Sequence, residues 1–231
     1  EKDPFAVLKS QADNLFQIND IQGALQKYKD ILEIDRTKAN IFMNIAICSK
    51  KLQDWEEVLT NSDMAISLDD TYIKSYKLRG EAKIETAKAM DGQEALDKMK
   101  DGLKDITKAK ALCKGQKKES FEDEITHSLL VAKKIIYYKE KEFQNTMRID
   151  LNEYLQEPID KYSENQKESE ELKKELNEFL TAIEPEEKKV PEFLTCPLTT
   201  EIINKPILLS SGNTYEKRSI EKYFAENGYK D

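Results

Sequence analysis

Apolar positions in the first 80 residues recur with a period of 34. Large side chains share one register of this period, at Leu8, Phe42 and Tyr76. Small side chains share another, at Ala12, Ala46 and Gly80. Within a unit the large residues recur at helical spacing, and the small ones lie where two helices must approach closely. Each unit is therefore predicted to be a helical hairpin. Neighbouring hairpins must stack to bury their apolar faces, which leaves a concave groove between successive first helices.

The third unit is less regular than the first two. Asp91-Gly92 interrupts the helix-like stretch that follows Gly80, and the helical pattern resumes from Gln93 to Cys113. We expect an insertion of roughly ten residues relative to the repeat period.

A second helical pattern begins at Phe121 and predicts a spacer. One apolar stripe runs through Ile125, Leu129, Ala132 and Ile136, and it continues at Phe143, Met147, Leu151 and Leu155. Pro158 is expected to end this helix. The stretch from Ile159 to Ile183 predicts another helix, with a stripe at Leu172, Leu176, Phe179 and Ile183. The two helices can form an antiparallel hairpin. Because neither buries its stripe by itself, we expect a homodimer, with a monomer whose rod packs on the repeats as the alternative.

The last forty residues predict a small unit that contains strands. It follows a charged linker at residues 184–189. Residues 207–209 suit a strand, residues 210–213 a turn, and Thr214-Tyr215 a returning strand. From Glu216 onward, Ile220 and Phe224 lie at helical spacing. The fold class is therefore predicted to be mainly α, with a small α+β segment at the carboxyl end.

Composition narrows the range of partners. The chain has 231 residues, of which 39% are hydrophobic and 35% charged, and this balance suits two small domains joined by a spacer. Its 45 acidic and 37 basic residues are interspersed and give a net charge of -8, so nucleic acid is not an expected partner. No apolar run reaches the roughly 18 to 20 residues of a membrane span. We therefore expect a soluble protein of the cytoplasm that has no membrane partner.

Cysteine and histidine usage argues against metal and redox chemistry. The three cysteines, Cys48, Cys113 and Cys196, are far apart and odd in number, so they offer neither a disulfide framework nor paired zinc ligands. The single histidine, His127, makes a catalytic triad or a histidine-rich metal site improbable. No cofactor or metal is expected.

The period and the small residues at positions 12, 46 and 80 resemble tetratricopeptide repeats, over about residues 5–115. In such domains that serve chaperones, lysine and asparagine side chains hold the carboxylates of a Glu-Glu-Val-Asp tail. By repeat position, the resemblance implies Lys9, Asn44 and Lys74 as tail-binding residues, and Phe121 joins them at the start of the spacer. The alternative is that these lysines are ordinary solvated helix residues.

Two positions depart from this family pattern. Asp13 stands where the family usually has asparagine, and Leu78 stands where it often has a basic residue. A carboxylate at position 13 would oppose a bound carboxylate by on the order of 1 to 4 kcal/mol at surface-like dielectrics. The tail-binding site is therefore expected to contain one unfavourable charge.

The carboxyl-terminal segment resembles the first half of a U-box. The resemblance rests on Cys-Pro-Leu-Thr at 196–199, Lys-Pro at 205–206 and Ser-Gly-Asn-Thr-Tyr-Glu-Lys-Arg-Ser-Ile at 211–220. It implies a RING-like architecture without zinc, with Leu198 as the contact for a ubiquitin-conjugating enzyme and Phe193 and Ile202 as its neighbours. Cys196 is expected to pack, because no basic partner motif supports a thioester nucleophile there. The family pattern continues past Asp231, so the resemblance implies an incomplete U-box and leaves the activity of this segment open.

In this order, the three parts resemble the CHIP-like co-chaperone ubiquitin ligases. The expected domains are three tetratricopeptide repeats at 1–118, the spacer and linker at 119–189, and the U-box segment at 190–231. The resemblance implies an adaptor for protein quality control that holds a heat-shock chaperone tail and a conjugating enzyme. Ubiquitin then passes to a misfolded client without a covalent intermediate, so no catalytic residue is assigned. The alternative is a non-enzymatic co-chaperone scaffold with an altered peptide groove.

Overall fold

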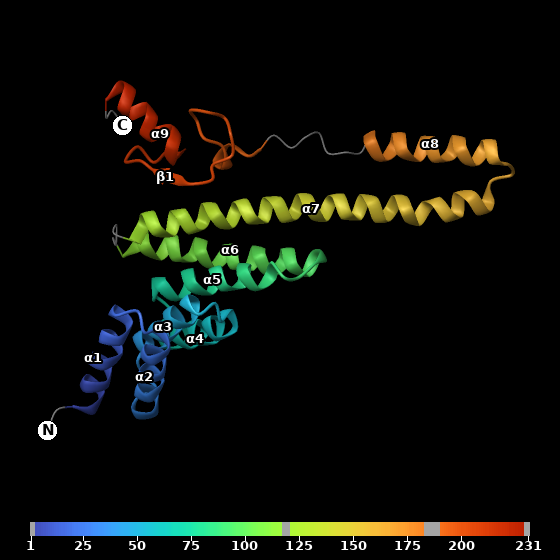
Figure 1. Cartoon of the computed structure of the whole chain (residues 1–231). Coiled ribbons are helices and arrows are strands. Elements are labelled where there is room, and N and C mark those ends of the chain that lie inside the picture. Colours follow the sequence, from blue (N-terminus) through green and yellow to red (C-terminus); the bar gives the residue numbers. More distant parts are fainter. Residues whose placement is uncertain (1–2, 117–120, 183–189, 229–231) are drawn as a thin grey trace. The chain divides into compact units, whose positions relative to one another are not determined.

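The computed structural model is mainly α-helical and describes residues 3–116, 121–182 and 190–228 (Figure 1). Its residues separate into two compact units, Glu1–Lys133 and Lys134–Asp231, which are considered one at a time below. A two-stranded sheet accompanies the helices in the second unit. The expected fold class is therefore confirmed.

Two regular hairpins open the first unit. They comprise α1 (Pro4–Gln17) with α2 (Ile21–Ile34), and α3 (Ala39–Lys51) with α4 (Trp55–Leu68). The turns inside the hairpins are equivalent, since Asn19 and Gln53 both adopt a positive φ, of 65° and 62°. The next residues, Asp20 and Asp54, cap the following helices through side-chain hydrogen bonds to backbone N–H groups. The same local chemistry thus closes both hairpins.

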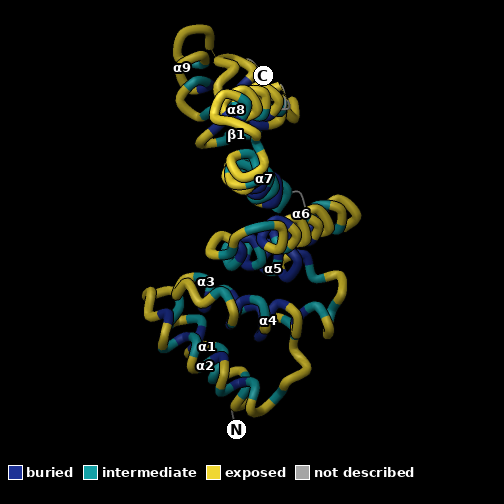
Figure 2. Tube along the Cα trace, turned by 90° about the vertical axis from the view of Figure 1, so that its right-hand side faces the viewer, coloured by how far each residue is buried: buried dark blue, intermediate teal, exposed yellow. Residues whose placement is uncertain are grey.

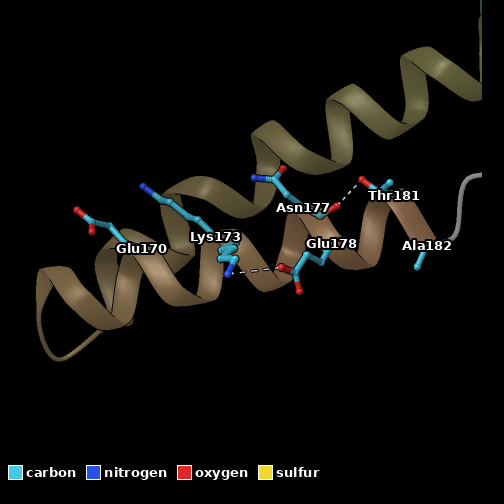
Figure 3. Close-up of a pocket in the computed structure, with 7 residues that line it drawn as sticks. Glu170, Lys173, Asn177, Glu178, Thr181 and Ala182 are labelled. Atoms are coloured by element: carbon cyan, nitrogen blue, oxygen red, sulfur yellow. Dashed lines mark hydrogen bonds and ion pairs between the residues drawn. The ribbon is translucent and has the colours of Figure 1, made fainter.

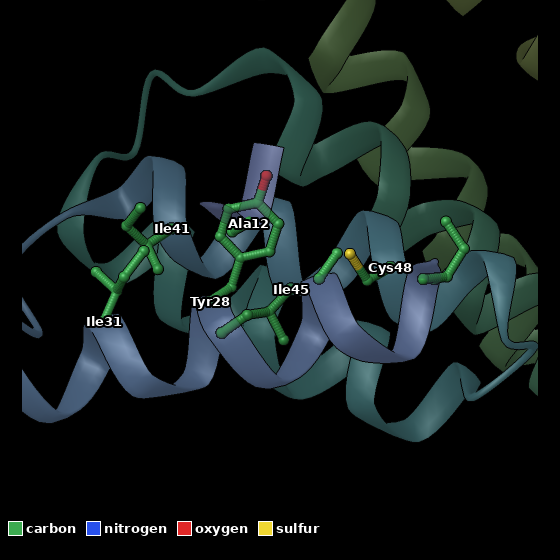
Figure 4. Packing of buried hydrophobic residues seen from close by; sticks show 8 residues of the cluster. Ala12, Tyr28, Ile31, Ile41, Ile45 and Cys48 are labelled. Carbon is green, nitrogen blue, oxygen red and sulfur yellow. The ribbon is translucent and has the colours of Figure 1, made fainter. Parts of the chain in front are cut away.

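Apolar side chains from three successive helices form the core of these hairpins. Figure 4 shows one cluster, in which buried residues of α1, α2 and α3 interdigitate. Its buried members are Ala12, Ile21, Ala24, Tyr28, Ile31, Ile41, Ile45 and Cys48. A second cluster joins α3, α4 and α5 (Ile73–Ala87), and includes Phe42, Met43, Ala46, Val58, Ala65, Leu78 and Ala82. Stacking, rather than any single hairpin, therefore buries the apolar faces.

The third hairpin joins α5 (Ile73–Ala87) to α6 (Gly92–Gly115). Nine of the fifteen residues in α5 are buried, and this helix lies between α3 and α6 (Figure 2). A Cβ atom built on Gly80 would lie 2.5 Å from the carbonyl oxygen of Gly102, so the two helices cross at backbone contact. α6 has 24 residues where α4 has 14, and the extra length of the third unit therefore extends one continuous helix.

A single long helix, α7 (Glu122–Tyr162), follows the repeats. The expectation that Pro158 ends the helix is wrong, because Pro158 lies inside α7. Proline removes only its own N–H donor, and the helix regains its backbone bonding beyond it, where Ser163 N–H donates to the Ile159 carbonyl at 3.1 Å. α8 (Gln166–Ala182) then turns back, and Asp160 accepts hydrogen bonds across the turn from Ser169 and Lys173.

The two apolar stripes of this region differ in exposure. Ile125, Ala132 and Ile136 are buried within the chain, so they are not available to a second copy. Large side chains further along α7 and on α8 are exposed: Met147, Ile149, Leu151, Tyr154, Leu172 and Phe179. Any self-association through the spacer must therefore use these later residues.

Residues 190–228 form a short unit with two antiparallel strands. A 3-10 turn, η2 (Glu192–Leu194), precedes β1 (Pro206–Leu208) and β2 (Thr214–Glu216), and α9 (Lys217–Asn227) follows. Ile207 pairs with Tyr215 in the ladder. Gly212 adopts a φ of 84° in the turn between the strands, a conformation that glycine tolerates without strain.

Candidate functional site

The predicted groove begins with a closed polar cluster in the first hairpin. Lys9 and Asp13 lie one turn apart on α1, and their charged groups pair at 3.0 Å. The second Asp13 oxygen accepts a 2.6 Å hydrogen bond from the hydroxyl of Tyr28 on α2. Burial raises the pKa of Asp13, but the bonds from Tyr28 and Lys9 outweigh it and lower the pKa overall. Both carboxylate oxygens are thus occupied, and Asp13 stays ionised beside Lys9.

A pocket of about 210 Å³ lies between α3, α5 and the start of α7. Its apolar wall consists of Ile47, Ile73, Leu78, Phe121 and Ile125. Lys50, Lys74, Lys77 and Glu124 line the remainder. Leu78 occupies the position where the tetratricopeptide family often has a basic residue. It is buried and belongs to the apolar wall. Half-buried Asn44 lies one helical turn before Ile47 on α3, which places it next along the same face.

Glu81 on α5 pairs with two of the three pocket lysines. Its carboxylate pairs with Lys50 at 2.5 Å and with Lys77 at 2.9 Å, and it accepts a hydrogen bond from the hydroxyl of Ser128 at 2.7 Å. Lys77 also pairs with Glu124 at 2.9 Å. Burial raises the pKa of Glu81, yet Lys77 and Lys50 outweigh it, so its pKa lies below the ordinary value. This network ties the first turns of α7 to α5 and closes one side of the pocket.

Lys74 differs from its neighbours because it is exposed and pairs with no carboxylate among the described residues. Its ammonium lies 4.9 Å from the centre of the Phe121 ring, within the range of a cation–π contact. Two of the predicted tail-binding residues, Lys74 and Phe121, therefore meet at the rim of the pocket. Lys9 and Asp13 meet each other in the first hairpin, and neither lines this pocket.

The second predicted site is a loop before β1. Thr195 bridges to Ile202, and Cys196 N–H donates to the Glu201 carbonyl at 2.8 Å, so the chain folds back on itself around Leu198. Leu198 is 42% exposed. Phe193 is also exposed, and Ile202 is half-buried. The loop therefore holds an apolar side chain at a fixed position on the surface.

Hydrogen bonds to Cys196 and Glu216 hold this loop in place. Cys196 is only 1% exposed, and its sulfur accepts a hydrogen bond from the Glu216 N–H at 3.3 Å. Burial raises the pKa of this thiol. Hydrogen bonds from the backbone N–H groups of Glu216, Leu198 and Thr199 lower it by a larger amount, so the net shift of the pKa is downward. The Glu216 carboxylate accepts the N–H groups of Asn204 at 2.6 Å and Lys205 at 2.9 Å. The part of the chain that the structure describes contains no group of three potential metal ligands.

A further open hollow lies along α8 (Figure 3). It is lined by Glu170, Lys173, Lys174, Asn177, Glu178, Thr181 and Ala182. Its charged groups pair within α8 or with α7, as in the 3.8 Å pair of Lys174 with Glu178 and the pair of Lys173 with Asp160. Across the described residues, no helix is long and apolar enough to cross a membrane.

Sequence reasoning missed Tyr28, Glu81 and Glu124. Tyr28 lies at an apolar position of the helical pattern, although its hydroxyl donates a hydrogen bond to Asp13. Glu81 lies four residues after Lys77, a spacing that favours an ion pair on a helix and could have drawn attention to it. Glu124 and Lys77 are 47 positions apart, so no local sequence pattern predicts their ion pair.

Comparison with known proteins agrees with this geometry. Residues 190–231 match the U-box domain family. The E3 ubiquitin-protein ligase CHIP of Arabidopsis thaliana is 25% identical over 240 aligned residues, which cover 96% of this chain and 81% of that protein. A DnaJ homolog subfamily C member 7 homolog of Schizosaccharomyces pombe is 33% identical over 105 residues, or 44% of this chain, and this chain spans only 20% of its length.

Among solved structures, the type III secretion translocator chaperone SycD of Yersinia enterocolitica has a TM-score of 0.50 at 14% identity. The likeness covers 61% of this chain and 88% of that one, and it concerns the fold alone. Together with the 34-residue hairpins, these matches support a CHIP-like organisation, with tetratricopeptide repeats followed by a U-box.

Proposed function

We propose that this chain is a chaperone-linked ubiquitin ligase, whose repeats bind the acidic tail of a heat-shock chaperone and whose U-box recruits a ubiquitin-conjugating enzyme. The observation that carries the ligase role is the exposed Leu198 on a loop fixed by Cys196 and Glu216, within the segment that matches the U-box family. The Arabidopsis relative, of which 81% aligns with this chain, is named as a ubiquitin ligase. This name supports the same role.

The peptide-binding role rests on the pocket between α3, α5 and α7. A carboxylate can pair with the ammonium of Lys74, and an aliphatic side chain can enter beside Phe121 and Ile47. Charge-assisted bonds of this kind are stronger than neutral ones. The ligase would then act by proximity, holding the chaperone's client near a charged conjugating enzyme. The cytoplasmic location and a role in protein quality control stay predictions.

Ubiquitin discharge tests the ligase role. The full-length protein should speed discharge of ubiquitin from a conjugating enzyme, and Leu198→Ala should reduce that stimulation roughly five- to thirtyfold, because an exposed apolar anchor contributes roughly 1 to 2 kcal/mol to binding. Leu52, directly after α3, has a matched exposure of 40% against 42%, so Leu52→Ala is the control and should change nothing. Peptide binding without any stimulated discharge, across a broad panel of conjugating enzymes, would favour the non-enzymatic scaffold.

We also propose a homodimer that forms through the exposed side chains of α7 and α8. Met147, Leu151, Tyr154 and Phe179 are large, apolar and exposed on one pair of consecutive helices. Monomeric proteins rarely leave an extended apolar surface uncovered. Light scattering at tens of micromolar should give twice the chain mass, and the mass of one chain would contradict the proposal.

A further inference from the structure

We infer that tail binding in this groove is carried by the pocket at Lys74, and that Asp13 keeps the ammonium of Lys9 out of the interaction. The inference rests on the proposed peptide-binding function. It goes further by assigning the interaction to one ammonium group, that of Lys74, at the rim of an apolar pocket. It also separates two lysines that both lie on first helices of the repeats.

The first step concerns the electrostatic state of the first hairpin. The Lys9 ammonium lies 3.0 Å from one Asp13 oxygen, and the Tyr28 hydroxyl lies 2.6 Å from the other. Tyr28 is a core residue of this hairpin, so its hydroxyl fixes the position of the Asp13 carboxylate. A peptide carboxylate that approaches Lys9 must compete with a carboxylate already bound there, and it also meets the negative charge of Asp13. Little net attraction remains.

The second step concerns the pocket between α3, α5 and α7. Lys50 and Lys77 are paired with Glu81, and Lys77 is further paired with Glu124. These two ammonium groups are therefore neutralised by partners within the protein. Lys74 has an aromatic ring and no carboxylate as its partner among the described residues, so it keeps its charge for a ligand. Within the pocket it is the lysine best able to attract a carboxylate.

The third step concerns what surrounds Lys74. Five apolar side chains, from Ile47, Ile73, Leu78, Phe121 and Ile125, line the same pocket. An apolar wall strengthens an adjacent ion pair by excluding water, and it gains contact energy from an aliphatic group. The site therefore fits a carboxylate that has an aliphatic side chain next to it. A purely acidic segment would leave the apolar wall unused.

A double-mutant cycle tests this inference, because it asks whether Lys9 matters only after Asp13 has been removed. The probe is a peptide ending in Glu-Glu-Val-Asp, titrated by calorimetry against the full-length protein and its variants. We expect Lys74→Met to weaken binding at least tenfold and Lys9→Met to weaken it less than threefold. Lys38→Met is the matched control for the loss of one exposed surface charge, and it should leave affinity unchanged.

Replacing Asp13 with asparagine completes the cycle. An asparagine can still accept the Tyr28 hydroxyl while it releases Lys9, so Asp13→Asn should raise affinity about tenfold, and adding Lys9→Met should then remove that gain. Thermal unfolding of Asp13→Asn checks that the hairpin is intact. If Asp13→Asn does not fold, the comparison of Lys9→Met with Lys74→Met still decides the question.

The outcomes separate this inference from the proposed function. A tenfold loss in Lys9→Met, or an unchanged affinity in Lys74→Met, overturns the inference while tail binding stands. A parent protein that does not bind the peptide at all overturns tail binding and the inference together. A large loss in Lys74→Met with little change in Lys9→Met supports both.

Discussion

Glu81 offers the sharpest test of how α7 is held to the repeats. Its side chain is 17% exposed, and its carboxylate receives Lys50, Lys77 and Ser128. Glu81→Gln keeps the size and shape of this residue but removes its charge. Lys77, at 10% exposure, is then left with Glu124 alone, which is 62% exposed and only weakly desolvated.

The loss of stability in Glu81→Gln depends on whether Lys50 and Lys77 can reach water or keep another partner. Breaking a buried ion pair by removing one partner costs about 3 to 5 kcal/mol when the remaining charge is stranded. Lys50 is exposed enough to turn to water, and Lys77 keeps one partner. We therefore expect a loss of about 2 kcal/mol, which corresponds to a fall in Tm of roughly 8 °C for a unit of this length.

The pH dependence provides an independent check. The folded pKa of Glu81 lies below its ordinary value of 4.5, because Lys77 and Lys50 outweigh the effect of burial. Its contribution to stability is therefore fully present above 4.5 and is lost as the pH falls through the lower folded value. The difference in unfolding free energy between parent and Glu81→Gln should be constant from about pH 6 to 8 and should shrink below about pH 4.5.

A neighbouring glutamate provides the matched control. Glu85 lies one turn further along α5 and pairs with Lys88 at 2.7 Å on the surface. Glu85→Gln should change the unfolding free energy by less than about 0.5 kcal/mol, because surface pairs contribute little. Urea unfolding followed by circular dichroism measures both variants. Equal effects of the two substitutions would refute the reasoning, since they would show that the Glu81 network adds nothing beyond a surface pair.

Three further predictions concern other parts of the chain. Gly80→Ala should lower the unfolding free energy by about 1 to 3 kcal/mol in urea titration, because its new Cβ would meet a backbone carbonyl of α6 at 2.5 Å, whereas Gly115→Ala, with nothing within 4 Å, should not. Cys196 should form no ubiquitin thioester in non-reducing gels, because its sulfur belongs to a residue that is 1% exposed. Replacing Met147 and Tyr154 together with serine should shift light scattering toward the mass of one chain, and an unchanged mass would place the interface elsewhere.

The hairpins of the first unit could be predicted because their determinants repeat along the sequence. The small side chain at position 80 is required by the close crossing of α5 and α6, and the same requirement at positions 12 and 46 makes the period visible. The exposed position of Leu198 could likewise be predicted, since a short motif fixes the loop around it, while its contact with a conjugating enzyme stays a prediction. In both cases the relevant contacts are local or recur at a constant spacing.

The groove could be predicted only in outline. Repeat position places Lys9 and Lys74 on equivalent helices, but it does not specify which carboxylate each ammonium meets. That choice depends on Tyr28 from a neighbouring helix, whose hydroxyl orients Asp13. Side-chain pairing between helices has no fixed spacing in the sequence, so the charge state of a groove follows from the fold and not from the repeat pattern.

The spacer shows a different limit. Pro158 was expected to stop a helix, yet α7 continues to Tyr162 because the loss of a single donor near the end of a long helix is tolerated. The buried state of Ile125 and Ile136 was also not foreseeable. An apolar stripe on a helix indicates that the stripe will be covered, but not whether the same chain or a second copy covers it.

The short, equivalent turns at Asn19 and Gln53 influence how the first unit folds. Each joins two helices adjacent in the sequence, so most stabilising contacts form between neighbouring elements and the chain has few long loops to close. A chain of this kind can begin folding at any of its hairpins and extend outward. We expect the repeats to fold as they leave the ribosome, before the residues of the U-box have been synthesised, so that the proposed peptide-binding groove forms before the proposed site for the conjugating enzyme.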